Sequence, residues 1–498
     1  MRWNIVCGGP AGQGPNFLAG LISQGLAQKG YYLFCSREYQ SMVRGGHNYN
    51  TITFSTEKVM SNTSGIDILI PLDKLSRKIH EKNTHKKTII YQEGEENSFY
   101  IGAIFKLLNL GFDSLENNLK GVRNAEEALK EAKKGYDSEK RKIELPLIKK
   151  RKNILLMDGS EAIALSAIKS GLDFYYAYPM TPATGLLVEL AKRQKDNSHY
   201  VVGLENEIAD IAAATGSAIT GAKVMVGTSG GGFDLMTEFL SFIGASGIPV
   251  VFYLAQRFGP GTGFPTGTGQ GDLDVACCSG HGEFTRIVVA PGDPTEAMER
   301  VSELFYLTQK YKVPGIILSD KHLAESVYLE TQKPRLKKSI KNISWPKRFS
   351  SYETDIKGEI SEKAEDLFKA AERRKLKREK ILQELEKLNS LEVFGNTQSK
   401  NLVLTWGSTK GPVLDATKEL NCKMIHVPYL EPLPKKLEKE IKSAKKVIVV
   451  ENNSDSPFSK LISKNFGYVI PEKNKILKYD GRQFFSDVIK NEIKKRIK

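Results

Sequence analysis

The residues of this sequence with the clearest capacity for chemistry lie between Tyr175 and Glu207. This stretch contains Tyr178-Pro179-Met180-Thr181-Pro182, in which two prolines bracket a threonine directly after an apolar segment. Proline fixes its own φ angle and restricts the residue before it, so the loop is expected to be rigid and extended. A loop of this kind presents the Thr181 hydroxyl and a row of backbone groups to a ligand.

Two acidic residues, Glu205 and Glu207, follow this loop where a second strand (200–202) leads into a helix of small residues. A carboxylate at the start of a closely packed helix is a candidate acid or base. The alternative is that both glutamates only stabilise the helix N-terminus through their charge. The neighbouring double-proline loop favours the chemical role.

The elements that must position these residues alternate as strand, turn and helix from about residue 154 to residue 319. This alternation predicts a parallel, doubly wound α/β sheet that binds ligands at the carboxyl ends of its strands. Three loops would then converge on one crevice. They are the double-proline loop, the glycine turn Gly227-Thr228-Ser229-Gly230-Gly231-Gly232, and the loop that begins at Arg257.

A second glycine-rich turn lies near the amino terminus, where an expected strand (4–7) meets Gly8-Gly9-Pro10-Ala11-Gly12-Gln13-Gly14 and an expected helix (16–29). A turn of this kind brings backbone amides to an anion, and phosphate is the natural candidate. Dinucleotide binding is the rival interpretation because acidic Glu38 follows the next strand. The glycines do not follow the G-x-G-x-x-G order, which disfavours that rival.

Composition limits the classes of function. The 498 residues are expected to form about three domains. Lysine and arginine exceed aspartate and glutamate by 73 to 58, but clustered aromatics and a nucleic-acid-binding motif are missing. We interpret the basic excess mainly as a solvated surface, with docking of an acidic partner as the alternative. The five cysteines include no Cys-x-x-Cys pair, which argues against an iron–sulfur or zinc site in this chain.

The sequence has no apolar run of about 18 residues that could cross a membrane. Its amino terminus runs directly into a strand-and-turn pattern without a secretory signal. We therefore expect a cytoplasmic protein that binds neither membrane nor nucleic acid.

These motifs together resemble the 2-oxoacid:ferredoxin oxidoreductases, whose signature is a Tyr-Pro-Ile-Thr-Pro loop followed by Glu-x-Glu. Met180 replaces the isoleucine here. Arg257 with the glycine-rich run after it, and the downstream Gln270-Gly271-Asp272-Leu273, match the same family. The amino-terminal glycine turn and Val43-Arg44-Gly45-Gly46 are similar to its gamma subunit, and the segment after residue 400 is similar to the carboxyl-terminal domain of transketolases.

The resemblance implies thiamine diphosphate as cofactor and coenzyme A as substrate. It implies that Glu207 bonds the aminopyrimidine ring and favours its imino form, that Thr181 faces the substrate, and that Arg257 binds the 2-oxoacid carboxylate. The remaining implied cofactor contacts are Tyr178, Pro179, Pro182, Glu205, Thr228, Ser229 and Gly230, and the contacts implied for coenzyme A are Gly12, Gly14 and Arg44.

The chain lacks the Gly-Asp-Gly motif that provides Mg²⁺ ligands for the diphosphate in such enzymes. The resemblance therefore implies a separate beta subunit that supplies Mg²⁺ binding and a [4Fe-4S] cluster. The chain would be a fused gamma–alpha subunit that oxidatively decarboxylates a 2-oxoacid to an acyl-CoA and passes electrons to ferredoxin. A dimer of heterodimers is the expected assembly.

Two alternatives stay open, a transketolase-like carboligase that needs no electron acceptor and a non-catalytic regulatory or binding paralogue. Pyruvate and 2-oxoglutarate share the same reacting head, so the substrate is not specified. The expected organisation is a gamma-type domain (1–137), a charged linker (138–153), a pyrimidine-binding domain (154–325), a polar connector with a helix at 361–391 (326–400), and a transketolase C-terminal-like domain (401–498).

Overall fold

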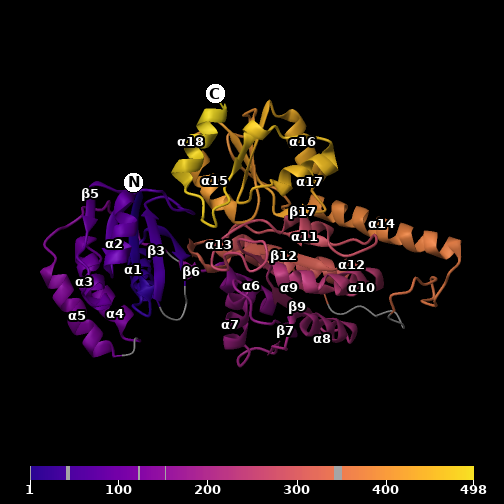
Figure 1. Ribbon diagram of the computed structural model, residues 1–498, viewed down its shortest axis with the longest axis horizontal. Coiled ribbons are helices and arrows are strands. Elements are labelled where there is room, and N and C mark those ends of the chain that lie inside the picture. Colours follow the sequence, from indigo (N-terminus) through magenta and orange to yellow (C-terminus); the bar gives the residue numbers. More distant parts are fainter. Residues whose placement is uncertain (1, 41–44, 122–123, 152, 341–349, 498) are drawn as a thin grey trace. The chain divides into compact units, whose positions relative to one another are not determined.

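The computed structural model describes residues 2–40, 45–121, 124–151, 153–340 and 350–497 (Figure 1). The chain divides into two compact units. Unit 1 consists of Met1–Met157, Ser326–Thr331 and Phe484–Asn491. Unit 2 consists of Asp158–Glu325, Gln332–Gln483 and Glu492–Lys498.

A seven-stranded mixed sheet forms the centre of unit 1, in the order β5-β4-β1-β3-β2-β13-β6. The β1, β4 and β5 strands are parallel, and the pairs from β1 through β3, β2 and β13 to β6 are antiparallel. The strands are β1 (Arg2–Ala11), β2 (Tyr32–Glu38), β3 (Gly45–Ser55), β4 (Ile66–Pro71), β5 (Thr84–Ile90), β6 (Leu155–Met157) and β13 (Val327–Glu330).

Helices pack on this sheet and on one another. Two glycines allow α3 and α5 to cross closely, because a Cβ atom at Gly102 would overlap the Ala132 carbonyl oxygen and one at Gly135 would overlap that of Phe99. The helices of unit 1 are α1 (Pro15–Lys29), α2 (Lys74–His80), α3 (Asn97–Leu107), α4 (Phe112–Leu119) and α5 (Ala125–Ser138).

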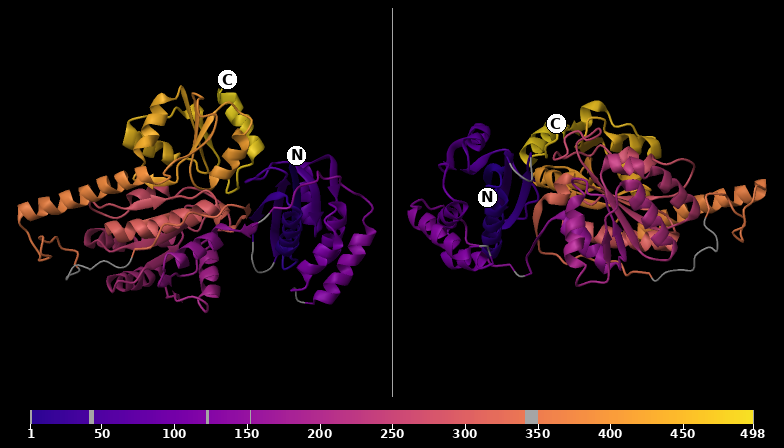
Figure 2. Two further views of the ribbon diagram at one scale, coloured as in Figure 1. Left: turned by 180° about the vertical axis from the view of Figure 1, so that it is seen from behind. Right: turned by 60° about the horizontal axis from the view of Figure 1, so that its bottom comes forward.

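The central sheet of unit 2 has seven strands in the order β17-β11-β12-β10-β9-β7-β8. All neighbours are parallel except β17, which lies antiparallel to β11. Every residue of β10 is buried, as expected for a strand covered on both faces (Figure 2). The strands are β7 (Phe174–Tyr176), β8 (Tyr200–Val202), β9 (Val224–Thr228), β10 (Val250–Gln256), β11 (Ile287–Val289), β12 (Gly315–Asp320) and β17 (Tyr429–Glu431).

The helices from α7 to α12 connect one parallel strand of this sheet to the next, as the doubly wound pattern requires, whereas α6 and α13 link the sheet to β6 and β13 of unit 1. They are α6 (Gly159–Lys169), α7 (Thr184–Arg193), α8 (Glu207–Ile219), α9 (Gly230–Leu235), α10 (Thr237–Ser246), α11 (Leu273–Cys278), α12 (Pro294–Tyr311) and α13 (Lys321–Glu325).

A third sheet has the order β14-β16-β15-β18-β19, and β14 alone is antiparallel to its neighbour. Its apolar side chains form one continuous core with those of the central sheet. The strands are β14 (Glu392–Gly395), β15 (Asn401–Thr405), β16 (Lys423–His426), β18 (Lys446–Glu451) and β19 (Lys475–Leu477), and the remaining helices are α14 (Ala364–Lys387), α15 (Lys410–Thr417), α16 (Lys435–Ser443), α17 (Pro457–Phe466) and α18 (Ser486–Ile497).

The predicted α/β class with three sheets is confirmed, and several local predictions need correction. The first sheet is mixed and not wholly parallel. β1 continues past Cys7 to Ala11, because Gly8 and Gly9 pair with β3 and let Ser76 and Leu72 pack closely above them. The predicted connector contributes β13 to this sheet, and residues assigned to the pyrimidine-binding domain contribute β6.

A buried charge cluster joins the central and third sheets of unit 2. Lys410 at the start of α15 lies 2.6 Å from Asp293 Oδ2, 2.6 Å from Glu392 Oε2 and 3.3 Å from Glu296 Oε2. His426 Nε2 lies 2.9 Å from the same Glu296 oxygen. Burial alone would lower the pKa of Lys410, but the three carboxylates raise it well above its usual value. The lysine therefore stays charged and neutralises its neighbours.

We expect Lys410→Met to lower the free energy of unfolding of unit 2 by about 3–5 kcal/mol, because three buried carboxylates lose their cation. The control is Lys442→Met, since Lys442 pairs with Glu438 but its side chain is 64% exposed. That variant should cost less than about 1 kcal/mol. Urea unfolding followed by circular dichroism measures both, and equal costs would contradict a structural role for the cluster.

Candidate active site

The double-proline segment forms the loop between β7 and α7, at the carboxyl end of the central sheet. Tyr178 is 42% exposed and Pro179 is also exposed, whereas Thr181 is half-buried and Pro182 is buried. The Thr181–Pro182 peptide bond is cis. The loop thus anchors one end in the core and leaves Thr181 partly accessible to a ligand.

The acidic pair lies at the start of α8, where Asn206 caps the helix by accepting a hydrogen bond from the Ala209 amide at 2.9 Å. Glu205 is exposed, but Glu207 is only 4% exposed. Within the described residues, Glu207 Oε1 has no hydrogen-bond partner. A buried acceptor without a donor costs free energy, so this oxygen is suited to a donor from outside the chain.

The β9–α9 turn lies directly against Glu207. A Cβ atom at Gly232 would overlap Thr228 Oγ1 and would lie 2.5 Å from Glu207 Oε1. Glycine at position 232 is therefore needed for Glu207 to approach α9. Ser229 is fully buried, and the described residues offer its hydroxyl no partner.

Arg257 begins the loop after β10 and contacts the double-proline loop. Its Nη1 donates a hydrogen bond to the backbone oxygen of Thr181 at 2.9 Å. Burial lowers the pKa of Arg257, and the neighbouring Asp272 opposes that effect. The hydrogen bond fixes the guanidinium against the double-proline loop.

Two aspartates that sequence reasoning did not assign to the site lie beside these residues, and Asp210 is buried whereas Asp272 is half-buried. Burial raises the pKa of Asp210 to about 6, and Glu207 adds to the rise. Burial and Asp234 raise the pKa of Asp272 to about 6. Asp210 could have been noticed because it follows Glu207 by three helical positions and so shares its face. Asp272 belongs to the segment Gln270-Gly271-Asp272-Leu273 that matches the family, but that match gave it no role in the site.

The structure thus brings several predicted residues together. Arg257 contacts Thr181, Glu207 and Thr228 meet across Gly232, and an added Cβ at Gly230 would lie 2.8 Å from Asp272 Oδ2. Glu205 stays outside this group because its side chain is exposed.

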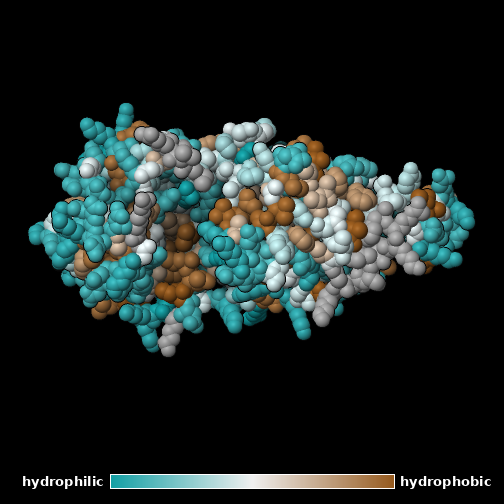
Figure 3. All heavy atoms as spheres, turned by 90° about the horizontal axis from the view of Figure 1, so that it is seen from below, coloured by the Kyte–Doolittle hydropathy of each residue, from teal (hydrophilic) through white to brown (hydrophobic). Residues whose placement is uncertain are grey.

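Apolar side chains are exposed on the face of unit 2 around α7 and α8, where Figure 3 shows brown surface among the teal. Tyr178 precedes the cis-proline, Ile208 follows Glu207, and Leu235 ends α9. Ile208 is 49% and Leu235 is 50% exposed. Exposed apolar residues grouped beside a ligand crevice are typical of a protein interface.

Two of the three residues predicted to contact coenzyme A, Gly12 and Gly14, are described residues of unit 1. Gly12 and Gly14 have φ angles of 94° and 75°, which favour glycine, and Gly14 caps α1. Asn97 Nδ2 closes the turn by donating to the Gln13 carbonyl at 2.5 Å. Arg44 lies outside the described residues.

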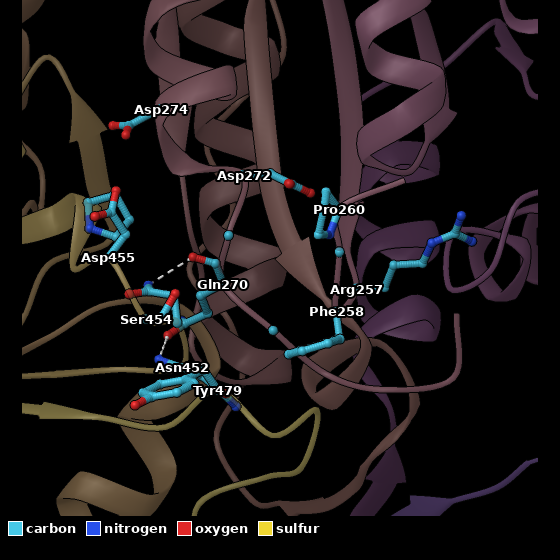
Figure 4. A pocket seen from close by; sticks show the side chains of 15 residues that line it. Arg257, Phe258, Pro260, Gln270, Asp272, Asp274, Asn452, Ser454, Asp455 and Tyr479 are labelled. Atoms are coloured by element: carbon cyan, nitrogen blue, oxygen red, sulfur yellow. Dashed lines mark hydrogen bonds between the residues drawn. The ribbon is translucent and has the colours of Figure 1, made fainter. Parts of the chain in front are cut away.

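A separate cavity of about 340 Å³ opens next to Arg257, between the loop after β10 and the loop after β18 (Figure 4). Gln270 joins its two sides. The backbone amide of Gln270 donates to the backbone carbonyl of Asn452 at 2.7 Å, and the backbone amide of Asn452 donates to the side-chain Oε1 of Gln270 at 2.9 Å.

Over the described ranges, the side chains of histidine, cysteine, aspartate and glutamate form no cluster of three or more that could hold a metal ion. In the same part of the chain, no helix combines the length and apolar character needed to span a membrane.

Comparisons with known families match two separate stretches of the chain. Residues 166–388 match the family described as pyruvate flavodoxin/ferredoxin oxidoreductase, thiamine diphosphate-binding. Residues 4–97 match the family described as pyruvate ferredoxin/flavodoxin oxidoreductase.

Two relatives illustrate the similarity. The 2-oxoacid:ferredoxin oxidoreductase subunit alpha of a Sulfolobus species is 29% identical over 100% of this chain and 97% of its own length. The 2-oxoglutarate synthase subunit KorA of Methanocaldococcus jannaschii is 32% identical over 60% of this chain and 88% of its own length.

Among solved structures, the 2-oxoglutarate:ferredoxin oxidoreductase from Magnetococcus marinus superposes with a TM-score of 0.89 over the whole of both chains at 23% identity, and so shares the fold. Neither a carboligase nor a non-catalytic paralogue is favoured by relatives that are named as oxidoreductase subunits. This chain belongs to the 2-oxoacid:ferredoxin oxidoreductase family, as an alpha subunit of the enzyme with a thiamine diphosphate-binding domain.

Proposed function

We propose that this chain, joined to a beta subunit, oxidatively decarboxylates a 2-oxoacid to an acyl-CoA and passes the electrons to ferredoxin. The observation that carries the proposal is the buried Glu207 Oε1, which has no hydrogen-bond partner among the described residues, at the edge of the sheet where Arg257 contacts the loop of Thr181. Relatives named as 2-oxoacid:ferredoxin oxidoreductase and 2-oxoglutarate synthase subunits support this reaction class.

The residues fit thiamine diphosphate on two counts. Glu207 Oε1 lacks a donor among the described residues and can accept a hydrogen bond from a ring nitrogen. Gly232, where an added Cβ would lie 2.5 Å from that oxygen, keeps a side chain from blocking it. The chemistry supplied by the bound cofactor is a nucleophilic carbon that also takes up the electron pair left by decarboxylation.

Glu207 would hold a proton at Oε1 and so set the protonation state of the aminopyrimidine ring. Arg257 would bind the carboxylate of the 2-oxoacid, because a planar guanidinium offers two parallel donors. Its contact with Thr181 fixes the orientation of that donor pair. The Thr181 hydroxyl would then face the ketone of the substrate.

The other predicted contacts would shape the crevice. Tyr178, Pro179 and Pro182 would form a rigid wall, Thr228, Ser229 and Gly230 would contact the cofactor from the β9–α9 turn, and Glu205 would lie at the edge. In unit 1, the turn at Gly12 and Gly14 would hold the phosphates of coenzyme A through backbone amides, together with Arg44.

A partner must complete the site, because the sequence lacks the Gly-Asp-Gly motif for a diphosphate-bound Mg²⁺. We propose that a beta subunit provides Mg²⁺ binding and the [4Fe-4S] cluster, in a dimer of heterodimers. The exposed apolar residues around Ile208 and Leu235 suit such an interface. The free cysteines suit a reducing compartment, and we place the enzyme in the cytoplasm.

We expect the chain purified alone to be inactive and to bind thiamine diphosphate weakly, because half of the site is supplied by the partner. Isothermal titration calorimetry with Mg²⁺ present measures the affinity. Submicromolar binding by the chain alone would contradict the division of the site between two subunits.

For Glu207→Gln in the reconstituted complex, we expect exchange of the cofactor C2 proton with deuterium to slow by at least about a hundredfold. Glutamine keeps the shape of the side chain but cannot hold a proton in the same way. Folding should hardly change, since a near-isosteric substitution at a helix start costs at most about 1 kcal/mol. Quenched-flow NMR measures the exchange.

The matched control is Glu205→Gln, which changes an exposed carboxylate two residues away. This variant should exchange at nearly the rate of the unmodified complex. Slow exchange in Glu205→Gln with normal exchange in Glu207→Gln would show that Glu205, and not Glu207, bonds the aminopyrimidine ring.

For Arg257→Ala in the complex, we expect kcat/KM for the 2-oxoacid to fall roughly 30- to 4000-fold, from a loss of about 2–5 kcal/mol when a buried charge loses its partner. Steady-state kinetics with a viologen dye measures the effect. Affinity for coenzyme A should stay constant, and an equal loss for both substrates would indicate a structural role for Arg257.

A further inference from the structure

A second buried carboxyl group lies beside Glu207 on helix α8. Asp210 follows Glu207 by three positions, which places both side chains on one face of the helix with their Cβ atoms about 5–6 Å apart. Asp210 is fully buried, and Glu207 is 4% exposed. Neither Glu207 Oε1 nor Asp210 Oδ2 has a hydrogen-bond partner among the described residues. The first turn of α8 therefore buries two carboxyl groups, each with an oxygen that lacks a donor.

The charged groups that act on Asp210 from α8 and the residues before it are acidic. Burial raises the pKa of Asp210 to about 6, and the charges of Glu207 and Glu205 add to the rise. The backbone amides of Leu204 and Tyr178 oppose it. Two like charges in a buried place cannot both ionise freely, so the ionisation of one carboxyl group favours a proton on the other.

Tyr175 of β7 is the ionisable group that faces Asp210 from the sheet. Burial raises the pKa of Tyr175 well above its usual value, and Tyr253 and Asp210 add to the rise, so this tyrosine is uncharged. Its hydroxyl lies close under β9, where an added Cβ at Gly227 would overlap it. Because Glu205 is exposed, the charge of Asp210 acts chiefly on the buried Glu207.

A structural role does not account for the carboxyl group of Asp210. Its Oδ1 accepts a hydrogen bond from the backbone amide of Leu204 at 3.3 Å. The side chain of Asn206 already caps α8. One uncharged oxygen would be enough for the Leu204 amide, and asparagine would provide it without burying a charge.

We propose that Asp210 is a positioning residue that acts through Glu207, because its buried charge keeps on Glu207 the proton that the cofactor ring requires. The proposal rests on the proposed function, which gives Glu207 that proton. Protonation of Glu207 removes one of two adjacent buried charges, so it is favoured whenever Asp210 is ionised. Asp210 itself is assigned no contact with cofactor or substrate.

The first test is Asp210→Asn in the reconstituted complex. Asparagine keeps an oxygen for the Leu204 amide and removes the charge. Without that charge the proton is held less tightly, so the bound aminopyrimidine ring should gain its proton at a pH about one unit lower. Circular dichroism of the bound ring as a function of pH measures the midpoint. An unchanged midpoint would overturn the proposal, since asparagine replaces a merely structural aspartate.

The matched control is Asp158→Asn in the same complex. Asp158 caps α6 by accepting a hydrogen bond from the Glu161 amide at 2.8 Å, and burial raises its pKa to about 6 as well. This variant should leave the midpoint of the ring where it is in the unmodified complex. An equal shift in Asp158→Asn would make the effect a general response to losing an aspartate, and would contradict the assignment to Asp210.

A double variant tests whether Asp210 acts through Glu207. Once Glu207→Gln has slowed exchange of the cofactor C2 proton, the addition of Asp210→Asn should slow it no further, because the group on which Asp210 acts is absent. Further slowing would mean that Asp210 acts on the ring directly, which the proposal excludes.

A reciprocal measurement decides the matter if Asp210→Asn does not assemble. The interaction between two sites is equal in both directions, so Glu207→Gln should lower the pH at which Asp210 takes up its proton. Infrared spectroscopy of the complex without cofactor, with ¹³C-labelled aspartate, measures that pH. The same value in the unmodified complex and in Glu207→Gln would overturn the proposal.

Dye reduction driven by a 2-oxoacid tests the proposed function separately. Its absence in the unmodified complex would overturn that function. Dye reduction by the unmodified complex, together with an unmoved midpoint in Asp210→Asn, would overturn only the role of Asp210.

Discussion

A buried carboxylate oxygen to which none of the described residues donates is the constraint on which the candidate site depends. Glu207 is held in this state by its position at the start of α8 and by the close approach of α9 at Gly232. The unpaired oxygen raises the free energy of the folded state. The favourable packing of helices on the parallel sheet offsets that cost. Thr181 follows β7, Thr228 ends β9 and Arg257 follows β10, so the three residues lie at the same edge of the sheet as neighbours.

The site also depends on how the third sheet is held against the central one. The Lys410 cluster and the hydrogen bonds of Gln270 fix the loop after β18 relative to the loop of Arg257. Charges buried in such a cluster contribute little net stability compared with apolar packing, but they tolerate few alternative arrangements. The continuous apolar core supplies the stability, and the polar contacts set the register in which the two loops face each other.

The sequence contained enough local information to predict the fold class, the three sheets and the contact region of Thr181, Glu207 and Arg257, because glycine turns, prolines and buried strand runs are local signals. It could not predict that Gly8 and Gly9 continue a strand, since that depends on pairing with β3 and packing against Leu72. The raised pKa of Asp272 arises from burial and from Asp234, which lies in helix α9 and is distant in sequence. The position of the loop after β18 likewise depends on Gln270, which is 182 residues away in sequence from its partner Asn452. The assigned roles of the site residues remain predictions.

One consequence follows from the short strand β17. It comes from the carboxyl-terminal part of the chain, yet it pairs with β11 and forms the outer strand of the central sheet. A protein truncated near residue 400 would leave β11 as a bare edge, with unpaired backbone groups open to pairing with another molecule. The part of the chain after residue 400 is therefore not independent of the part before it. Any gene fusion or fission in this family would have to keep β17 paired with β11.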